Sequence, residues 1–308
     1  MRDSFGRALV RACQADPDLF VLDADCAHST RSGWVGERLP ASFRNVGIAE
    51  QNMVGMAAGL ALAGRRPVVS GFASIVVARA AEQILLSVAL PGLPVVIAGH
   101  YAGMSGALEG APHHAITDLA FLRAVPGMAV WVPADDTDAD QLGTEILRGT
   151  GPRYIRLCRD SVPALTGGPR VAGDIRRWDR PEPVVALLGC GVAVGECVRA
   201  AEELTSAGIT TTALGMLRLK PFPTAETLAL VRGCRLVVTV EEHTTVGGLG
   251  GAVAEALAGP GPRLVRLGIA DRFTETGPYR QLLTRYGITS SAIATVVRRE
   301  LADQPERD

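Results

Sequence analysis

Lysine is almost absent from this sequence: Lys220 is the only lysine among 31 basic residues, and all the others are arginine. With 32 acidic residues the formal net charge is −1, which leaves no basic surface of the kind that nucleic-acid-binding proteins carry. The chain also lacks an apolar run of the roughly 18 residues needed to cross a membrane, and its N-terminus has no hydrophobic signal-peptide core. We therefore expect neither a nucleic-acid nor a membrane partner.

Paired cysteines are missing as well. The six cysteines lie scattered along the chain, without a Cys-x-x-Cys pair or the spacing of a metal-ligand set. Such a distribution is typical of reduced, mostly buried thiols in a cytoplasmic protein. We therefore expect a cytoplasmic location and no metal ligands in this chain.

The residues that are present indicate an α/β protein with two domains. Of the 308 residues, 47% are hydrophobic and 20% are charged, which is enough apolar material for two cores. Short apolar runs, typical of buried parallel strands, alternate with amphipathic helical segments. We predict a first domain over 1–165, a linker over 166–183 and a second domain over 184–308. Each domain is expected to contain a largely parallel sheet flanked by helices.

The expected elements follow from these patterns. In the first domain they are a helix over 3–15 and strands over 20–22, 67–70, 93–98, 129–133 and 152–159. In the second domain they are strands over 184–188, 210–213 and 236–241 and helices over 193–207 and 247–257. The linker is predicted because its glycines, prolines and charges show no periodicity, and 302–308 is expected to be a solvated tail.

The segment from Arg44 to Gly64 places one acidic side chain, Glu50, between an apolar strand end and a helix of small residues. The helix is predicted to begin near Ala49, and its glycines and alanines allow another backbone or a ligand to approach closely. Two interpretations of Glu50 stay open at this level. It is either a first-turn carboxylate favoured by the helix dipole or a partly buried carboxylate held for proton transfer.

Two polar loops follow predicted strands of the first domain. The first runs from Asp23 to Thr30, and open α/β sheets bind ligands at the carboxyl ends of their strands. The second runs from Gly99 to His114 and carries three of the five histidines of the chain. Three histidines in one glycine-rich loop after a buried strand indicate a functional site rather than exposed bystanders.

Two other patterns favour structural roles. The acidic run 135–140 has the spacing of a capped helix N-terminus, where carboxylates are favoured, rather than that of a metal site. The turn Gly189-x-Gly191 follows a predicted strand but lacks a well-placed third glycine and acidic partner. We therefore do not expect a dinucleotide site there.

The run F-R-N-V-G-I-A-E-Q-N-M-V-G-M-A-A-G-L-A, which contains Glu50, resembles the pyrimidine-binding domain of the transketolases. It is most similar to the split transketolases and to deoxyxylulose-phosphate synthase. The next segment resembles the family's helix F-A-x-F-x-x-x-R-A-x-E-Q, with matches at Phe72, Arg79, Glu82 and Gln83.

Further matches follow in the family's order. The glycine-rich loop resembles H-x-G-x-x-x-G-E-D-G-x-x-H-Q, and the strand that ends at Arg159 resembles P-x-Y-I-R-L-x-R. Residues 219–222, together with V-T-V-E-E-H-T-T-V-G-G-L-G, resemble the transketolase C-terminal domain, which carries no established catalysis in the family. Together the matches span roughly residues 20–285.

The resemblance implies which residues hold thiamine diphosphate. Glu50 would hydrogen-bond the aminopyrimidine ring and share a proton with it, and Phe72 would stack against that ring. Ile75 replaces the family's second aromatic, which keeps an apolar wall without ring stacking. Asp25 would lie near the cofactor.

The resemblance also implies the substrate contacts. His100 and His113 would be catalytic residues that contact the substrate and move its hydroxyl protons, while Ser29 and Arg159 would hold a sugar phosphate. When the loop motif is matched from His100, it carries one inserted residue. It also has Glu109 in place of aspartate and His114 in place of glutamine. These departures predict an altered sugar specificity.

The family's G-D-G…N motif, which holds the diphosphate and its magnesium ion in a separate N-terminal domain, does not occur in this sequence. The resemblance therefore implies half of a cofactor site. It predicts the small subunit of a split transketolase that transfers a two-carbon ketol unit from a ketose to an aldehyde. Thiamine diphosphate and Mg²⁺ would be shared with a separate diphosphate-binding subunit, in a heterotetramer with self-association.

Two alternatives remain. The β subunit of a thiamine-dependent 2-oxo-acid dehydrogenase has the same two-domain plan, although G-I-A-E-Q and H-H-A-I-T-D-L-A favour a transketolase. A non-catalytic regulatory partner with a decayed site is the other alternative. Ile75 and the altered loop favour it, whereas the presence of Glu50, His100 and His113 argues against it.

Overall fold

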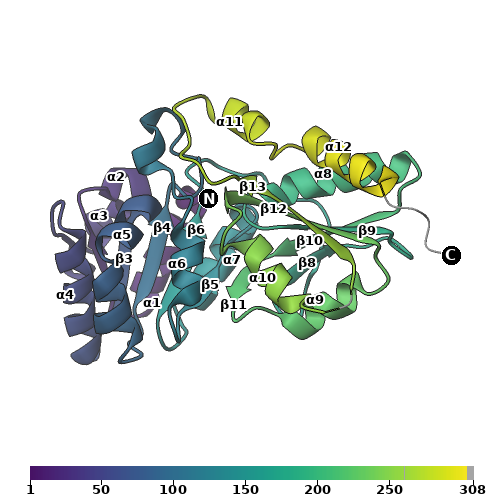
Figure 1. Ribbon diagram of the computed structural model, residues 1–308. Coiled ribbons are helices and arrows are strands. Elements are labelled where there is room, and N and C mark those ends of the chain that lie inside the picture. Colours follow the sequence, from purple (N-terminus) through teal and green to yellow (C-terminus); the bar gives the residue numbers. More distant parts are fainter. Residues whose placement is uncertain (260, 304–308) are drawn as a thin grey trace.

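The computed structural model of the protein describes residues 1–259 and 261–303 and contains two sheets, each covered by helices on both faces (Figure 1). The predicted α/β class is confirmed. None of the described helices is long and apolar enough to cross a membrane.

The first sheet has the strand order β11-β5-β6-β4-β3-β1-β2. All neighbouring strands are parallel except β11, which comes from the second half of the chain and pairs antiparallel with β5. The bounds of its strands are β1 Leu19–Asp23, β2 Phe43–Asn45, β3 Arg66–Phe72, β4 Val96–His100, β5 Ala129–Trp131, β6 Arg153–Leu157 and β11 Arg218–Lys220.

The second sheet has the order β13-β12-β9-β10-β8-β7. Its four central and outer strands β13, β12, β9 and β10 are parallel, and β8 and β7 add an antiparallel edge. The bounds are β7 Arg170–Val171, β8 Ile175–Trp178, β9 Val185–Gly189, β10 Thr211–Met216, β12 Leu236–Thr244 and β13 Arg263–Ile269.

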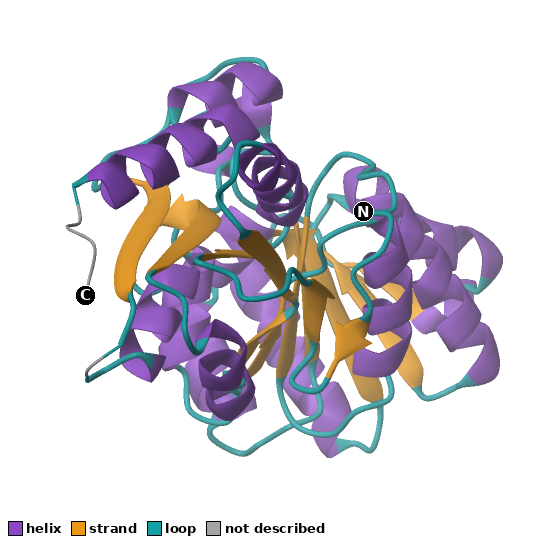
Figure 2. Ribbon diagram, turned by 90° about the vertical axis from the view of Figure 1, so that its right-hand side faces the viewer, coloured by secondary structure: helices purple, strands orange, loops and turns teal. Residues whose placement is uncertain are grey.

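Helices cover both faces of each sheet (Figure 2). On the first sheet, α1 packs with α3 and α7 on one face, and α4, α5 and α6 cover the other. On the second, α8 and α12 lie on one face and α9 and α10 on the opposite face. The α-helices are α1 Arg2–Ala15, α2 Ala27–Thr30, α3 Gly33–Arg38, α4 Glu50–Leu62, α5 Ala73–Arg79, α6 Asp118–Ala124, α7 Asp136–Ile146, α8 Ala193–Ser206, α9 Thr224–Val231, α10 Leu249–Ala256, α11 Tyr279–Arg285 and α12 Ser290–Ala302. Short 3₁₀ helices are η1 Pro40–Ser42, η3 Ala107–Glu109 and η4 Ala111–His113, and η2 Gln83–Ala89 is a π-helix.

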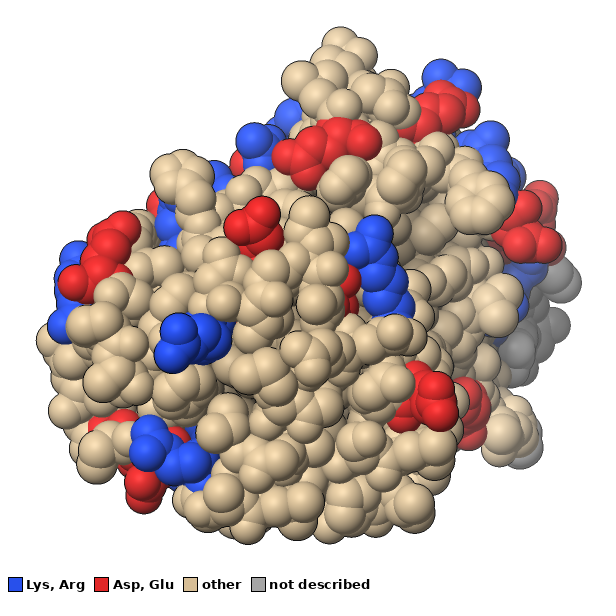
Figure 3. Space-filling view, turned by 90° about the vertical axis from the view of Figure 1, so that its left-hand side faces the viewer, with Lys and Arg blue, Asp and Glu red and all other residues tan. Residues whose placement is uncertain are grey.

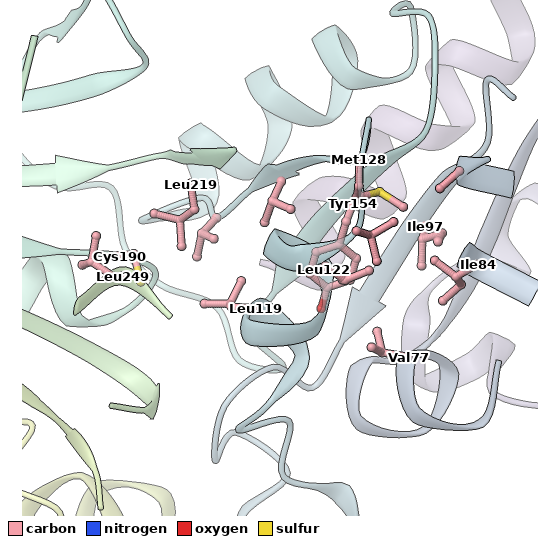
Figure 4. Close-up of a cluster of buried hydrophobic side chains, with 14 of the residues drawn as sticks. Val77, Ile84, Ile97, Leu119, Leu122, Met128, Tyr154, Cys190, Leu219 and Leu249 are labelled. Atoms are coloured by element: carbon pink, nitrogen blue, oxygen red, sulfur yellow. The ribbon is translucent and has the colours of Figure 1, made fainter. Parts of the chain in front are cut away.

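One hydrophobic cluster continues from the first sheet into the second. It contains Ile97, Leu119 and Tyr154 from the first sheet and its helices, and Cys190 and Leu249 from the second (Figure 4). Because apolar side chains from both halves are buried in the same cluster, the two sheets are packed against each other rather than joined only through the chain.

The segment 166–183 corrects the prediction of an irregular linker, because it contributes β7 and β8 to the second sheet. An ionic contact, rather than a row of apolar side chains, holds β8 in place. The buried Arg176 of β8 donates to Asp135 at 2.6 Å and to Asp138 at 3.2 Å. Because a buried ion pair holds this strand, its sequence lacks the alternation of apolar residues from which a strand is predicted.

The acidic run at the start of α7 caps that helix. The Asp135 carboxylate accepts a hydrogen bond from the backbone N–H of Asp138 at 2.8 Å, which is the N-cap contact. The capping interpretation is therefore confirmed. The predicted tail over 302–308 begins at the last residue of α12, and its residues 304–308 lie outside the described part of the chain.

Candidate functional site

Glu50 is the first residue of α4 and lies in a nearly enclosed position. It is 7% exposed, and its two carboxylate oxygens accept from Arg79 at 3.0 and 3.1 Å. The helix start supplies a partial positive charge that favours a carboxylate there. Both interpretations of Glu50 therefore share one geometry: a helix-start carboxylate that is also nearly buried, with a half-exposed arginine as its partner.

Phe72 and Ile75 lie at the junction of β3 and α5, the helix that carries Arg79, and both are partly exposed. Burial, helped by the carboxylates of Asp23 and Glu50, raises the pKa of the Cys26 thiol to about 12, while the Phe72 backbone acts in the opposite direction. Arg79 thus joins Glu50 to the helix that carries Ile75 and follows Phe72.

Asp25 belongs to the loop that follows β1, where its φ is 61°. Its backbone N–H donates to Asn45 Oδ1 at 3.1 Å, and Asn45 Nδ2 donates back to Asp25 Oδ1 at 3.2 Å. Asn45 Oδ1 also accepts from the N–H of Gly47 at 2.9 Å. Asp25 thus ties this loop to the turn that leads into Glu50.

His100 is not at the site surface. The predicted strand 93–98 is displaced to Val96–His100 because Pro94 has no N–H to donate to the ladder. Side chains alternate along a strand, so His100 follows Val96 and Ala98 into the core against Phe5, with ring centroids 5.9 Å apart. Its ring is fully buried, with Nε2 3.2 Å from Ser70 Oγ. This burial corrects the expectation that His100 contacts the substrate.

Tyr101, the next residue, is also buried at 3% exposure, but it packs against Phe72 rather than Phe5. Its ring lies 4.4 Å from that of Phe72, and its hydroxyl accepts from Arg2 at 3.0 Å. The guanidinium of Arg159 lies 5.4 Å from the same ring. Tyr101 has a φ of 58°, in the left-handed region, so the extended backbone of β4 ends at His100.

The structure also gives a better match for the loop motif. In H-x-G the histidine stands two residues before the glycine, and in this chain the residue two before Gly103 is Tyr101. Matching from Tyr101 removes the inserted residue and places Ala107 at a family glycine. Ala107 has a φ of 47°, the left-handed conformation that favours glycine. The spacing to Gly103 was the sequence signal that could have identified Tyr101.

His113 and His114 have different surroundings. The partly exposed ring of His113 lies 5.7 Å from that of Phe72, and its Nδ1 is buried without a partner among the described residues. His114 is buried, with Nδ1 2.7 Å from Thr274 Oγ1, and burial lowers its pKa. His113 therefore faces the candidate site, whereas His114 anchors the loop to the second half of the chain.

Ser29 and Arg159 are brought together through Arg2 and Tyr101. Arg2 donates to the backbone oxygen of Ser29 at 2.9 Å and, from the same nitrogen, to the Tyr101 hydroxyl. Arg159 also lies beside that ring, and its Nε is buried without a partner in the described part of the chain. Two guanidinium groups beside one tyrosine form a positively charged end of the site. No sequence motif pointed to Arg2.

The burial of His100 predicts a specific pH dependence of stability. Burial, with smaller effects of the N-terminal amine and Arg2, lowers its pKa from 6.5 to about 3. Below pH 6.5 the unfolded chain therefore binds a proton that the folded chain does not, so the free energy of unfolding falls as the pH falls. For the variant His100→Asn we expect the slope between pH 6 and pH 4 to decrease by about 1.4 kcal/mol per pH unit.

Urea unfolding of both proteins at intervals from pH 8 to pH 4 measures this difference. At pH 8 a histidine is neutral in either state, so the difference there gives the pH-independent effect of the substitution. Other buried titrating groups, such as His243 and Glu241, are common to both proteins and cancel. Equal slopes would mean that His100 is protonated in the folded chain.

These groups fit the aminopyrimidine half of thiamine diphosphate. Glu50 offers a nearly buried carboxylate at a helix start, Phe72 offers an aromatic ring, and His113 has a buried Nδ1 without a partner among the described residues. For a metal ion the described residues offer no corresponding set, since no group of three or more His, Cys, Asp or Glu side chains is placed to hold one.

Comparisons with known proteins place this geometry in a family context. The family described as "Transketolase, pyrimidine binding domain" matches residues 1–164, and "Transketolase, C-terminal domain" matches residues 176–293. A putative transketolase C-terminal section from Methanocaldococcus jannaschii is 35% identical, covering 98% of this chain and 96% of that protein. A 6-deoxy-6-sulfo-D-fructose transketolase subunit from Clostridium sp. is 34% identical, covering 95% and 92%.

Among solved structures, a split-gene transketolase described as an inactive β4 tetramer is similar over 98% of this chain and 97% of that one. Its TM-score is 0.86 and its sequence identity is 36%. The chain also matches 1-deoxy-D-xylulose-5-phosphate synthases at 34–36% identity, but it spans only about half their length, 47% of each. Its full-length relatives are thus the separate C-terminal chains.

Proposed function

Because this chain belongs to the transketolase family, we propose that it is the small subunit of a heteromeric split transketolase. The enzyme would transfer a two-carbon ketol unit from a ketose to an aldehyde with thiamine diphosphate. The observation that carries this proposal is the nearly buried carboxylate of Glu50 at the start of α4, paired with Arg79 of α5, the helix that follows Phe72.

Glu50 acts on protons in this proposal. Its carboxylate would hold the proton of a pyrimidine ring nitrogen, and Arg79 would keep that carboxylate in place through both oxygens. Phe72 and Ile75 would form the apolar wall against the ring. Bound thiamine diphosphate would supply the carbanion chemistry, while the protein supplies orientation and proton placement.

The opposite end of the site suits an anionic ketose. His113 would handle a substrate hydroxyl proton, and Arg2 and Arg159 would attract a phosphate or sulfonate at the far end of the sugar. The Clostridium relative, named for 6-deoxy-6-sulfo-D-fructose, supports a sulfonate as one possibility. Leu108 and Glu109 are exposed at the tip of the loop, where the family pattern has two acidic residues, so the entrance differs from that pattern.

A second subunit would complete the cofactor site, and an exposed apolar surface supports a docking place for it. This surface, the α4 face, consists of Ile48, Met56 and Leu62 together with Leu86 and Leu90 at η2. Leu62 and Leu90 are 74% and 78% exposed. Figure 3, which looks onto the α4 end of the molecule, shows a broad surface with few charged residues. Such surfaces usually mark protein interfaces.

We assign the α4 face to the diphosphate-binding subunit because it is continuous with Glu50. The helix that carries the exposed Met56 and Leu62 begins at Glu50, so a subunit that held the diphosphate and Mg²⁺ beside this half-site would also cover α4. The similar split-gene transketolase, described as an inactive β4 tetramer, supports self-association of this type of chain.

The substrate proposal predicts a preference among donors. We expect the assembled enzyme to use a ketose with an anionic group at C6, such as 6-deoxy-6-sulfofructose or fructose 6-phosphate, better than xylulose 5-phosphate. We expect about 10-fold or more in kcat/KM, the range that small differences in pocket contacts provide. A donor panel with ribose 5-phosphate and shorter aldehydes as acceptors measures this preference.

The variant Arg159→Met provides the control, because it keeps the length of the side chain and removes its charge. It should raise KM for anionic ketoses but leave unphosphorylated fructose unaffected. Efficient use of xylulose 5-phosphate with ribose 5-phosphate would make the protein an ordinary transketolase subunit and refute the altered specificity. Absence of ketol transfer for every pair, from an assembled enzyme with cofactor bound, would refute the proposed function.

A further inference from the structure

The glycine loop, defined here as residues 103–114, is held on one side by the second half of the chain. Glu242 accepts from the backbone N–H of Met104, and His114 Nδ1 lies 2.7 Å from Thr274 Oγ1. The backbone N–H of Gly277 reaches the oxygen of Ala107 at 3.5 Å. In the first of these contacts a buried carboxylate holds the backbone of the loop rather than one of its side chains.

Three residues surround the carboxylate of Glu242: Met104, Tyr279 and Gly103. Glu242 lies in β12 and is 3% exposed. One carboxylate oxygen accepts from Met104, and the other accepts from the Tyr279 hydroxyl at 2.9 Å. Gly103 has a φ of 61°, and a Cβ atom there would collide with the Glu242 carboxylate. The loop therefore approaches Glu242 as closely as a glycine permits.

The opposite side of the same loop carries the site residues. Tyr101 lies two residues before Gly103, and His113 lies at the far end of the loop, where both rings contact Phe72. The backbone N–H of Gly103 donates to Ala115 at 3.1 Å, which closes the loop at its base. A change at Met104 would therefore move the segment that joins Tyr101 to His113.

We propose that Glu242 is a positioning residue: its carboxylate, held by Tyr279, fixes the glycine loop so that Tyr101 and His113 face the substrate. This rests on the proposed function, because it assigns a role within the same site. It gives the second half of the chain a part in substrate handling, through a residue that does not touch the substrate. The positioning itself is a property of the chain and is measurable without activity.

Glu241 offers a matched control. It is the neighbouring residue in β12, is fully buried and, because strand side chains alternate, points to the other face. There its oxygens accept from the backbone N–H groups of Leu249 and Gly250 at 2.7 and 2.8 Å, at the start of α10. Burial raises the pKa of both carboxyl groups to about 7. The two variants therefore remove equivalent buried carboxylates that hold different segments.

Hydrogen exchange of the full chain without its partner tests the positioning. In Glu242→Ala we expect faster amide exchange across residues 103–110, and in Glu241→Ala we expect faster exchange at 249–252 instead. Glu242→Gln, which still offers an oxygen to Met104, should restore most of the protection. Because loss of a buried carboxylate can lower overall stability, Tyr279→Phe tests the same contact with a smaller change and should also loosen the loop.

Kinetics of the assembled enzyme test the consequence. We expect Glu242→Ala to lose about 10–100-fold in kcat/KM, with cofactor affinity unchanged, and Glu241→Ala to lose much less. Equal loop exchange in all variants, or equal kinetic losses in the two alanine variants, would overturn the proposal. If the wild-type assembly showed no ketol transfer, the proposed function would fail, while the exchange experiment would still decide the role of Glu242.

Discussion

Replacing Glu50 with glutamine should slow ketol transfer by the assembled enzyme by about 10²–10⁴-fold, the range expected for a positioned acid–base group. Glutamine keeps the volume of the side chain and offers hydrogen-bonding atoms to Arg79, but it cannot share a proton with a ring nitrogen. Because Glu50 is nearly buried and in contact with Arg79 through both oxygens, no other carboxylate on α4 can take its place. Steady-state rates at saturating substrate and cofactor measure the effect.

The matched control is Glu255→Gln, which removes an exposed carboxylate from α10 and should leave the rate unchanged. Cofactor binding and subunit assembly are measured on the same samples, so that a loss of rate is separated from a loss of structure. A Glu50→Gln enzyme that assembles, binds thiamine diphosphate and keeps nearly the wild-type rate would reduce Glu50 to a helix-start carboxylate.

The second large effect concerns the missing half of the site. The purified chain should show no ketol transfer by itself and little affinity for thiamine diphosphate, and activity should appear on titration with a diphosphate-binding subunit. We expect this because the sequence lacks the family's diphosphate-binding motif, so that the partner subunit would hold the diphosphate and its Mg²⁺.

Variants that introduce charges on the α4 face test where the partner subunit binds. Leu62→Glu and Leu90→Glu place carboxylates on an exposed apolar surface, which costs little in the free chain but opposes burial against a partner. They should weaken assembly and activity together. Val246→Glu, at an equally exposed apolar residue of the second half of the chain, should not. Full activity from the chain alone, at a purity that excludes the partner, would refute the split-enzyme proposal.

Residues close to one another in the sequence were predicted well. The strand runs are continuous and apolar because parallel strands buried on both faces must be so, and β9 and β10 lie within one or a few residues of their predicted ranges. The cap at Asp135 and the helix start at Glu50 depend on neighbouring residues and were correctly located. The family motifs around Glu50 and Phe72 are local in the same sense.

Residues whose roles depend on partners far away in the sequence were not predicted correctly. His100 was expected at the site because the family motif was matched from it, but β4 includes His100, and the alternation of that strand sends its ring into the core. Tyr101 was overlooked because that match was accepted with one inserted residue, whereas a match from Tyr101 needs none. Arg2 reaches Tyr101 across 99 positions of the chain, a distance that no local pattern spans.

The sequence by itself therefore determined the α/β class, the family and the carboxylate at the start of α4, since each depends on periodicity, spacing or capping within a short segment. Only the tertiary structure decided that His100 is buried in the core while Tyr101 packs against Phe72, that β8 and β11 complete the two sheets, and that Glu242 holds Met104 from 138 positions away. These outcomes follow from the direction of strand side chains and from buried polar contacts, which form only when distant segments meet.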